Sequence, residues 1–182
     1  MGESADDWSR FEAEYRDSYQ AVSRYLRRRL PPDLVDDAVS EVFTIALERW
    51  STRQGAALPW LYGIARRVAA NARRSLGRAD RLAGRLRDEE DPLGGEPGAD
   101  TEVLDRMGAA RVLERLPERD REVLMLVSWD GLDPQEAAQA LGCGKATFAV
   151  RLHRARRRLE RELAREITAV ADQGSMTERT AT

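Results

Sequence analysis

The chain has 182 residues, and its 30 basic and 32 acidic side chains give a formal net charge of only −2. A single Cys and a single His exclude an intrachain disulfide and a Cys/His metal cage, and they argue against a His-based catalytic triad. No stretch reaches the apolar length of a membrane span, and the N-terminal residues MGESADDW lack the apolar core of a signal peptide, so we expect a cytoplasmic protein without metal or cofactor.

The first predicted element is a long amphipathic helix. Aromatic and apolar residues recur every three or four positions over residues 8–30, and the Pro31-Pro32 pair ends the pattern. A second helix is predicted from about Asp33, whose side chain can cap it, to Trp50. These two helices would pack through their apolar faces.

A third helix is predicted after a short polar loop at residues 51–57. It opens with Pro59 and continues with helical spacing to Arg74. Residues 58–87 contain eight Arg against a single acid. The three helices therefore predict one small domain over residues 1–87, with a basic surface on its last helix.

Residues 88–100, DEEDPLGGEPGAD, combine acids with Pro and Gly and show no helical period, which is the composition of a solvated linker. We interpret this segment as a flexible spacer, and the alternative is that its acids shield the basic surfaces when no partner is bound. Helicity resumes near Thr101 and predicts a second domain over residues 101–170. The polar tail at residues 171–182 is predicted to be disordered.

The second domain contains a helix-turn-helix pattern. Pro117 suits the first turn of one helix, and Gly131 ends that helix. The next helix is predicted to begin at Pro134 with Asp133 as its N-cap, and to end at Gly142. A tight turn then leads into the last helix.

That last helix carries a ladder of arginines. An apolar stripe is supplied by Thr147, Phe148, Leu152, Ala155 and Leu159, whereas residues 145–158 contain six Lys or Arg and no acid. Such a helix can place its N-terminal side chains on base edges and its arginines on phosphates. The alternative is a solvated basic face on an ordinary helical hairpin, but the combination of caps, tight turns and one-sided charge favours DNA binding.

Two segments of the first domain, DLVDDAVSEVF (33–43) and LPWLYGIARRVAANARR (58–74), resemble region two of bacterial RNA polymerase sigma factors of the extracytoplasmic-function group. The segment from LPERDREVLML to RLHRARRRL (116–159) resembles their region four. The resemblance covers roughly residues 10–165 in the family order. It implies an all-α fold of two small helical domains, one like region two and one like the helix-turn-helix of region four, joined by the flexible acidic linker.

The resemblance implies an alternative sigma factor, which binds core RNA polymerase, directs promoter recognition and DNA opening, and is not itself an enzyme. It implies docking on the β′ clamp and the β flap of the polymerase, and control by an anti-sigma protein that is often membrane-tethered. Asp36, Asp37 and Glu41 fall where these factors present an acidic helix to the clamp, and Val42 and Phe43 are expected to supply the packing there. The two aspartates also suit the first turn of a helix, where they complement its dipole.

The third helix falls where family members bind the minus-ten element, and the loop at residues 51–57 falls where they hold a base flipped from the non-template strand. Arg67 stands where many members have Asn, while Arg73 and Arg74 are expected on phosphates. Trp60 is either a core residue, which we favour, or a base contact. The candidate minus-ten residues are Trp60, Arg66, Arg67, Asn71, Arg73 and Arg74.

In region four the family often has polar residues where this chain has Ala149 and Val150, which can contact a thymine methyl group but cannot hydrogen-bond to a base. His153 and Arg154, one turn further on, are therefore expected to read bases, and arginines further along are expected on phosphates. The candidate minus-thirty-five residues are Lys145, Thr147, Ala149, Val150, Arg151, His153, Arg154, Arg156, Arg157 and Arg158.

Two other classes of function are open at this point. A stand-alone helix-turn-helix regulator would use residues 1–87 as a sensor or dimerisation domain, but a sensor does not need the basic helix found there. A nucleic-acid-processing enzyme would need a cluster of metal-binding carboxylates or a nucleophile motif, and the sequence shows neither. We therefore predict promoter DNA, core RNA polymerase and an anti-sigma factor as partners, with no small-molecule substrate and no membrane insertion.

Overall fold

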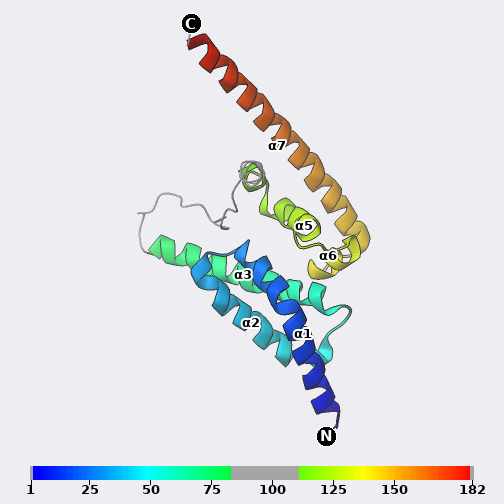
Figure 1. Ribbon diagram of the computed structural model, residues 1–182. Helices are drawn as coiled ribbons and strands as arrows, with labels where there is room; N and C mark the ends of the chain where they lie inside the picture. Colours follow the sequence, from blue (N-terminus) through cyan, green and yellow to red (C-terminus); the bar gives the residue numbers. More distant parts are fainter. Residues whose placement is uncertain (1, 83–110, 181–182) are drawn as a thin grey trace. The chain divides into compact units, whose positions relative to one another are not determined.

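The computed structural model describes the backbone of residues 2–82 and 111–180, and the side chains of residues 8–78, 111–166 and 168 (Figure 1). The secondary structure in these ranges is entirely helical, with no strand among them, as the sequence predicts. The predicted linker at residues 88–100 lies outside the described residues. The described residues form two compact units, one of residues 2–82 with 135–143 and one of residues 111–134 with 144–180.

Three long helices dominate the first unit. Its elements within residues 2–82 are, in chain order, α1 (Gly2–Arg27), the 3-10 turn η1 (Pro32–Leu34), α2 (Val35–Glu48), the 3-10 turn η2 (Trp50–Thr52) and α3 (Ala57–Leu82). Each of these helices was predicted from its hydrophobic period. The polar loop before α3 is also where the sequence predicts it.

The start of α2 differs from the prediction. α1 ends at Arg27, before the Pro31-Pro32 pair, but α2 begins only at Val35 because the second proline starts a 3-10 turn that includes Asp33. The N-cap of α2 is Leu34, and no side-chain hydrogen bond caps the helix. The predicted cap by Asp33 is therefore wrong.

The three helices pack against one another around an apolar core. Tyr25 of α1 and Tyr62 of α3 stack with their ring centroids 4.8 Å apart, and the Arg29 guanidinium lies 3.5 Å from the centroid of the Tyr25 ring. Leu30, which follows α1, is also buried, and the other buried side chains come from all three helices: Val22, Leu26, Val39, Val42, Ala46, Leu61, Ile64 and Val68. Because the apolar faces point inward, the outward faces of α2 and α3 are left for partners.

The second unit is built on the packing of α5 (Glu118–Ser128) against α7 (Lys145–Thr180). Phe148, Leu152 and Ala155 of α7 are buried and Leu159 is half-buried, which confirms these four members of the predicted stripe. Thr147 is exposed, so its assignment to the stripe is wrong: it lies at the edge of the buried face, about 100° from Phe148. The other buried apolar side chains of this unit precede α7: Val112, Leu113, Leu116, Val123, Leu124, Met125, Leu126 and Leu132.

Left-handed glycines end the helices that precede α7. α6 (Pro134–Ala140) is followed two residues later by Gly142, which has a φ of 63°. The N–H groups of Gly142 and Cys143 bond back to carbonyls of α6 at 3.0 and 2.9 Å, the pattern of a Schellman cap. Gly131, which follows α5, has a φ of 71°. Both predicted glycine stops are therefore confirmed, and α7 starts directly after the second turn.

α7 is longer than the sequence analysis expects. It continues as one helix to Thr180, through most of the tail that was predicted to be disordered from residue 171 (Figure 1). The reason is that no Pro occurs after Pro134, and a lone Gly174 costs a helix only about 1 kcal/mol relative to Ala. Polar composition alone does not end a helix.

Candidate nucleic-acid and polymerase interfaces

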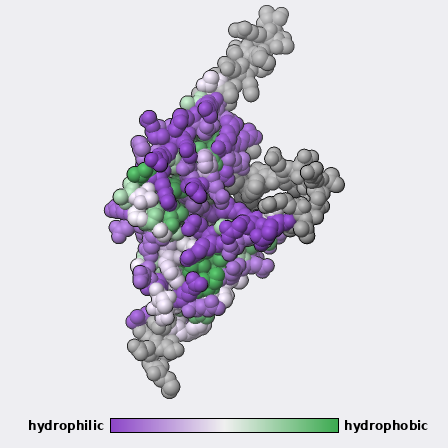
Figure 2. All heavy atoms as spheres, turned by 180° about the vertical axis from the view of Figure 1, so that it is seen from behind, coloured by the Kyte–Doolittle hydropathy of each residue, from purple (hydrophilic) through white to green (hydrophobic). Residues whose placement is uncertain are grey.

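The N-terminal half of α7 has a narrow buried stripe, and most of its other side chains are exposed. Figure 2 shows hydrophilic side chains over most of the visible face and only small apolar areas. The predicted minus-thirty-five residues are all exposed: Lys145, Thr147, Ala149, Val150, Arg151, His153, Arg154, Arg156, Arg157 and Arg158. The structure therefore leaves this entire set accessible.

Several of these arginines have no ion-pair partner in the part of the chain that the structure describes. Among the described residues, Arg151, Arg154 and Arg157 form no ion pair. A helix turns about 100° per residue, so Val150, Arg154 and Arg157 lie opposite the buried stripe. The Val150 side chain is 50% exposed, which leaves its methyl groups open to a thymine methyl. An apolar contact and free guanidinium groups thus share the outward face.

Arg158 differs from its neighbours on the helix. Its guanidinium forms an ion pair with Asp120, which lies in the first turn of α5. Arg158 is predicted from the sequence to contact phosphate, but in the structure it has a partner within the protein.

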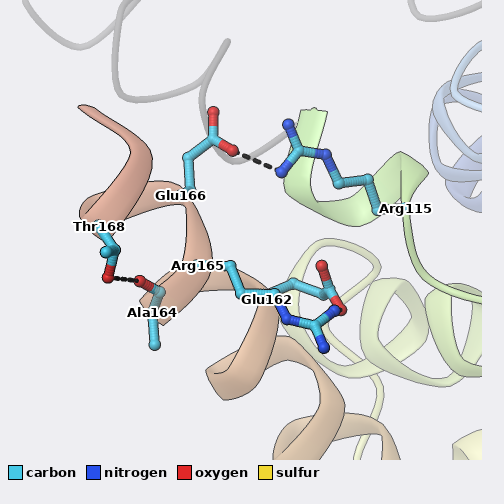
Figure 3. Close-up of polar contacts among 6 residues, drawn as sticks. All are labelled: Arg115, Glu162, Ala164, Arg165, Glu166 and Thr168. Carbon is cyan, nitrogen blue, oxygen red and sulfur yellow. Dashed lines mark hydrogen bonds and ion pairs between the residues drawn. The ribbon is translucent and has the colours of Figure 1, made fainter. Parts of the chain in front are cut away.

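Further along α7, acids alternate with arginines. Arg115, just before α5, pairs with Glu166, with the two side-chain atoms 2.5 Å apart (Figure 3). Arg165 pairs with Glu162 at 2.8 Å. These acids offset neighbouring positive charges. The one-sided positive charge is therefore confined to the N-terminal half of α7.

α3 carries a second basic strip. Arg67, Asn71 and Arg74 are exposed at spacings of four and three residues, which places them on one face of the helix. Arg74 donates a hydrogen bond to the Asn71 amide oxygen, which orients that amide. Arg78 is exposed four residues after Arg74 and continues the strip. Arg78 is not among the residues predicted from the sequence to contact the minus-ten element, although its spacing of four residues from Arg74 is a sufficient signal.

The remaining minus-ten candidates, Trp60, Arg66 and Arg73, are half-buried. The Trp60 ring packs edge-on against Trp50 with the centroids 6.2 Å apart, and Trp50 packs in the same way against Phe11 at 5.3 Å. Trp60 thus continues the aromatic core of the unit. This packing supports the core alternative over a base contact.

The loop at residues 51–57 is polar and largely exposed. Gly55 has a φ of 75°, which favours glycine, and Arg53 donates a hydrogen bond to its carbonyl at 3.0 Å. The Arg53 guanidinium also lies 4.6 Å from the centroid of the Trp50 ring. A cation and an aromatic ring beside an exposed loop are the groups that hold unstacked bases in other proteins.

The predicted polymerase-binding acids Asp36, Asp37 and Glu41 are exposed on the outer face of α2. Val42 and Phe43 are buried, and Phe43 packs against rings of α1. The expectation that these two side chains pack on the polymerase is therefore wrong, because the hydrophobic period of α2 turns them into their own core.

Leu47 is the apolar side chain that the outer face of α2 does display. Its exposed fraction is 43%, and it lies three helical turns from Asp36 on the same side of the helix. Leu47 falls outside the buried period that ends at Ala46. That break in the period is the signal that sequence reasoning missed.

The described residues contain no group of three or more His, Cys, Asp or Glu side chains that could hold a metal ion. The same part of the chain also has no helix long and apolar enough to cross a membrane.

The two units together define a helical nucleic-acid-binding protein, with a basic helix beside a polar loop and a second basic helix after a helix-turn-helix sequence. The family patterns described as Sigma-70 region 2 and Sigma-70, region 4 match residues 14–79 and 106–159. The chain belongs to the RNA polymerase sigma factors of the extracytoplasmic-function group. It is an alternative sigma factor that directs transcription initiation, and the stand-alone regulator finds no support.

Similar proteins cover most of the chain. The RNA polymerase sigma-E factor of Streptomyces coelicolor is 34% identical over 88% of this chain and 90% of its own length. The ECF RNA polymerase sigma factor SigD of Mycobacterium tuberculosis is 33% identical over 78% of this chain and 71% of its own. The sigma factor RpoE from Bartonella quintana, solved in complex with the anti-sigma factor NepR, has the same fold, with a TM-score of 0.67 and 23% identity over 85% of this chain and 96% of the solved one.

Proposed function

We propose that this sigma factor contacts promoter DNA with the outward faces of α3 and α7, and core RNA polymerase with the outer face of α2. The minus-ten element would lie on α3 and on the loop at residues 51–57, and the minus-thirty-five element on the N-terminal half of α7. The domain limits of this division, residues 1–87 and 101–170, are those predicted from the sequence.

The separation of charge is the observation that carries this proposal. The outer face of α2 displays acids, and residues 35–48 contain no base. The described side chains of α3 and residues 145–158 of α7 display arginines and contain no acid. Opposite charges on different helices suit two partners of different charge, a polymerase surface and a DNA backbone.

Promoter opening, as proposed here, needs binding and no bond chemistry. A base held by the polar loop beside Trp50 and Arg53 would stabilise the melted strand. We therefore infer that the protein acts without a catalytic residue of its own, and that it acts in the cytoplasm, where the polymerase meets the chromosome.

A separate anti-sigma protein is the proposed means of control. The sigma factor RpoE is solved in complex with NepR, and CnrH is solved in complex with the cytosolic domain of CnrY. Both share this fold. A protein that covers the acids of α2 would block access to the polymerase.

Transcription in vitro tests the proposal. The purified chain and core RNA polymerase are given a library of promoter-sized duplexes, and the RNA start sites are sequenced. We expect start sites that core polymerase alone does not use, preceded by two shared elements. Binding of duplex DNA without any new start site would contradict the proposal and favour a stand-alone regulator.

Arg154→Ala is expected to weaken promoter binding by the holoenzyme by about 1–3 kcal/mol and to relax base preference at one or two positions, as loss of a bidentate base contact does. Arg157→Ala is the comparison variant, and it should lower affinity evenly across sequences. The measurement is selection of minus-thirty-five sequences from a randomised duplex library. Unchanged preference for Arg154→Ala would remove Arg154 from the residues that read bases.

A further inference from the structure

We infer that Asp120 and Arg158 form a positioning pair that sets the orientation of α7 for reading the minus-thirty-five element. The inference rests on the proposed function of α7. Asp120 lies in the first turn of α5, and Arg158 lies 38 residues later in the chain, yet their side chains meet in an ion pair. The pair therefore joins the recognition helix to the helix that supports it.

The two side chains of this ion pair differ in how far they are buried. The Asp120 side chain is only 14% exposed, so its carboxylate is shielded from solvent and depends on the Arg158 guanidinium as a partner. Arg158 is 49% exposed. Arg154 and Arg157, one turn and one residue before it, form no ion pair among the described residues. Arg158 is therefore paired within the protein, whereas the guanidinium groups of Arg154 and Arg157 are available to bind DNA.

The first turn of α5 is itself firmly held, which makes Asp120 a fixed anchor. The guanidinium of Arg121, the next residue, donates hydrogen bonds to the carbonyls of Leu113, Glu114 and Leu116 at 3.0, 2.7 and 3.4 Å. These bonds tie α5 to the segment before it. Adjacent residues therefore fix α5 on one side and α7 on the other.

Because Arg158 lies some distance along α7 from the residues that read bases, a small tilt of the helix at Arg158 moves those residues. Val150 lies eight residues before Arg158, which is about 12 Å along the helix axis. A tilt of α7 by about 5° at Arg158 would shift Val150 by about 1 Å, enough to misalign a base contact. The apolar contacts of Phe148 and Ala155 are not directional, whereas the ion pairs Asp120–Arg158 and Arg115–Glu166 are. Of these two ion pairs, Asp120–Arg158 is the nearer to the residues that read bases, so it is the one that best resists such a tilt there.

Charge removal separates this role from a phosphate contact by Arg158. If Arg158 bound phosphate and Asp120 merely competed with it, Asp120→Asn would strengthen DNA binding, because one negative charge would leave the interface. If the pair positions α7, Asp120→Asn weakens specific binding although the protein has become more positive. The two assignments predict opposite signs.

The experiment uses the full chain with core RNA polymerase and the duplex that parent holoenzyme selects from a randomised library. Asp120→Asn and Arg158→Gln are each expected to lower affinity for that duplex about 3- to 10-fold, in the range expected for losing a partly exposed ion pair. Asp120→Asn should also broaden the minus-thirty-five preference. The charge swap Asp120→Arg with Arg158→Asp should restore affinity and preference to within about twofold of the parent.

Glu160→Gln is the matched control, because it removes an exposed acid of α7 that has no ion pair among the described residues. It should keep the parent preference. Urea unfolding of each variant shows whether a loss of affinity follows a loss of fold, and the charge swap remains decisive if a single variant unfolds. Equal or tighter binding by Asp120→Asn with unchanged preference would overturn the inference. Failure of the parent to select any duplex would instead count against the proposed function.

Discussion

Phe148→Ala is expected to lower the free energy of unfolding of the second unit by about 3–5 kcal/mol, the cost of removing a large aromatic side chain from a packed core. Phe148 has no exposed surface and lies in the first turn of α7, the helix that packs against α5. Loss of its ring would leave a cavity in the core around it. Because small domains are stable by only about 5–15 kcal/mol, the unit would be close to unfolding.

Val150→Ala is the matched control for this prediction. Val150 lies two residues further along the same helix and is half exposed, so its truncation should change stability by no more than about 0.5 kcal/mol. Urea unfolding followed by circular dichroism measures both variants. Phe148→Ala should also abolish minus-thirty-five recognition while the first unit still binds core polymerase. Equal midpoints for the two variants would show that the core of this unit lies elsewhere.

The features of this structure that could be predicted from sequence are those that depend only on residues close together in the chain. The stripe of Phe148, Leu152 and Ala155 follows from helical period alone, and the stop at Gly142 follows from the need for a left-handed residue. Asp33 shows the limit of local reasoning. A good capping residue was present, but the preceding prolines placed it in a 3-10 turn before the helix began.

The parts that could not be predicted depend on which helices pack together. Phe43 belongs to a motif that suggests a binding face, but α1 covers it in the folded unit. The partner of Arg158 is equally invisible in the sequence, because Asp120 comes close only once α5 has packed on α7. A run of arginines in the sequence does not indicate which of them forms an ion pair within the protein.

For the candidate sites, the sequence predicted best which face of each helix is exposed. Arg67, Asn71 and Arg74 were named from a family motif, and the structure presents them as one strip. Leu47 was missed because the motif that drew attention to α2 ends before it. The sequence motifs therefore identified the correct helix faces, and the structure added exposed residues that lie beyond the motifs.

The double charge reversal Asp37→Lys with Glu41→Lys is expected to weaken binding to core RNA polymerase by roughly 100-fold or more, because like charges placed against each other across an interface cost several kcal/mol. Both side chains are exposed on the outer face of α2, so folding should be nearly unaffected. The comparison variant is Glu114→Lys with Glu160→Lys. It makes the same change in net charge at two exposed acids outside the first unit, and it should bind the polymerase as the parent does.

Salt dependence then separates the acids of α2 from its apolar residue. The loss caused by the double reversal should shrink as salt rises from about 0.05 to 0.5 M, because the Debye length falls to a few ångströms. Leu47→Ala should lower affinity by about tenfold at every salt concentration, since burial of an apolar side chain is not screened. Titration of fluorescently labelled variants with core polymerase measures both effects. If the double variant is folded and binds core polymerase as tightly as the parent, the polymerase does not use this face of α2.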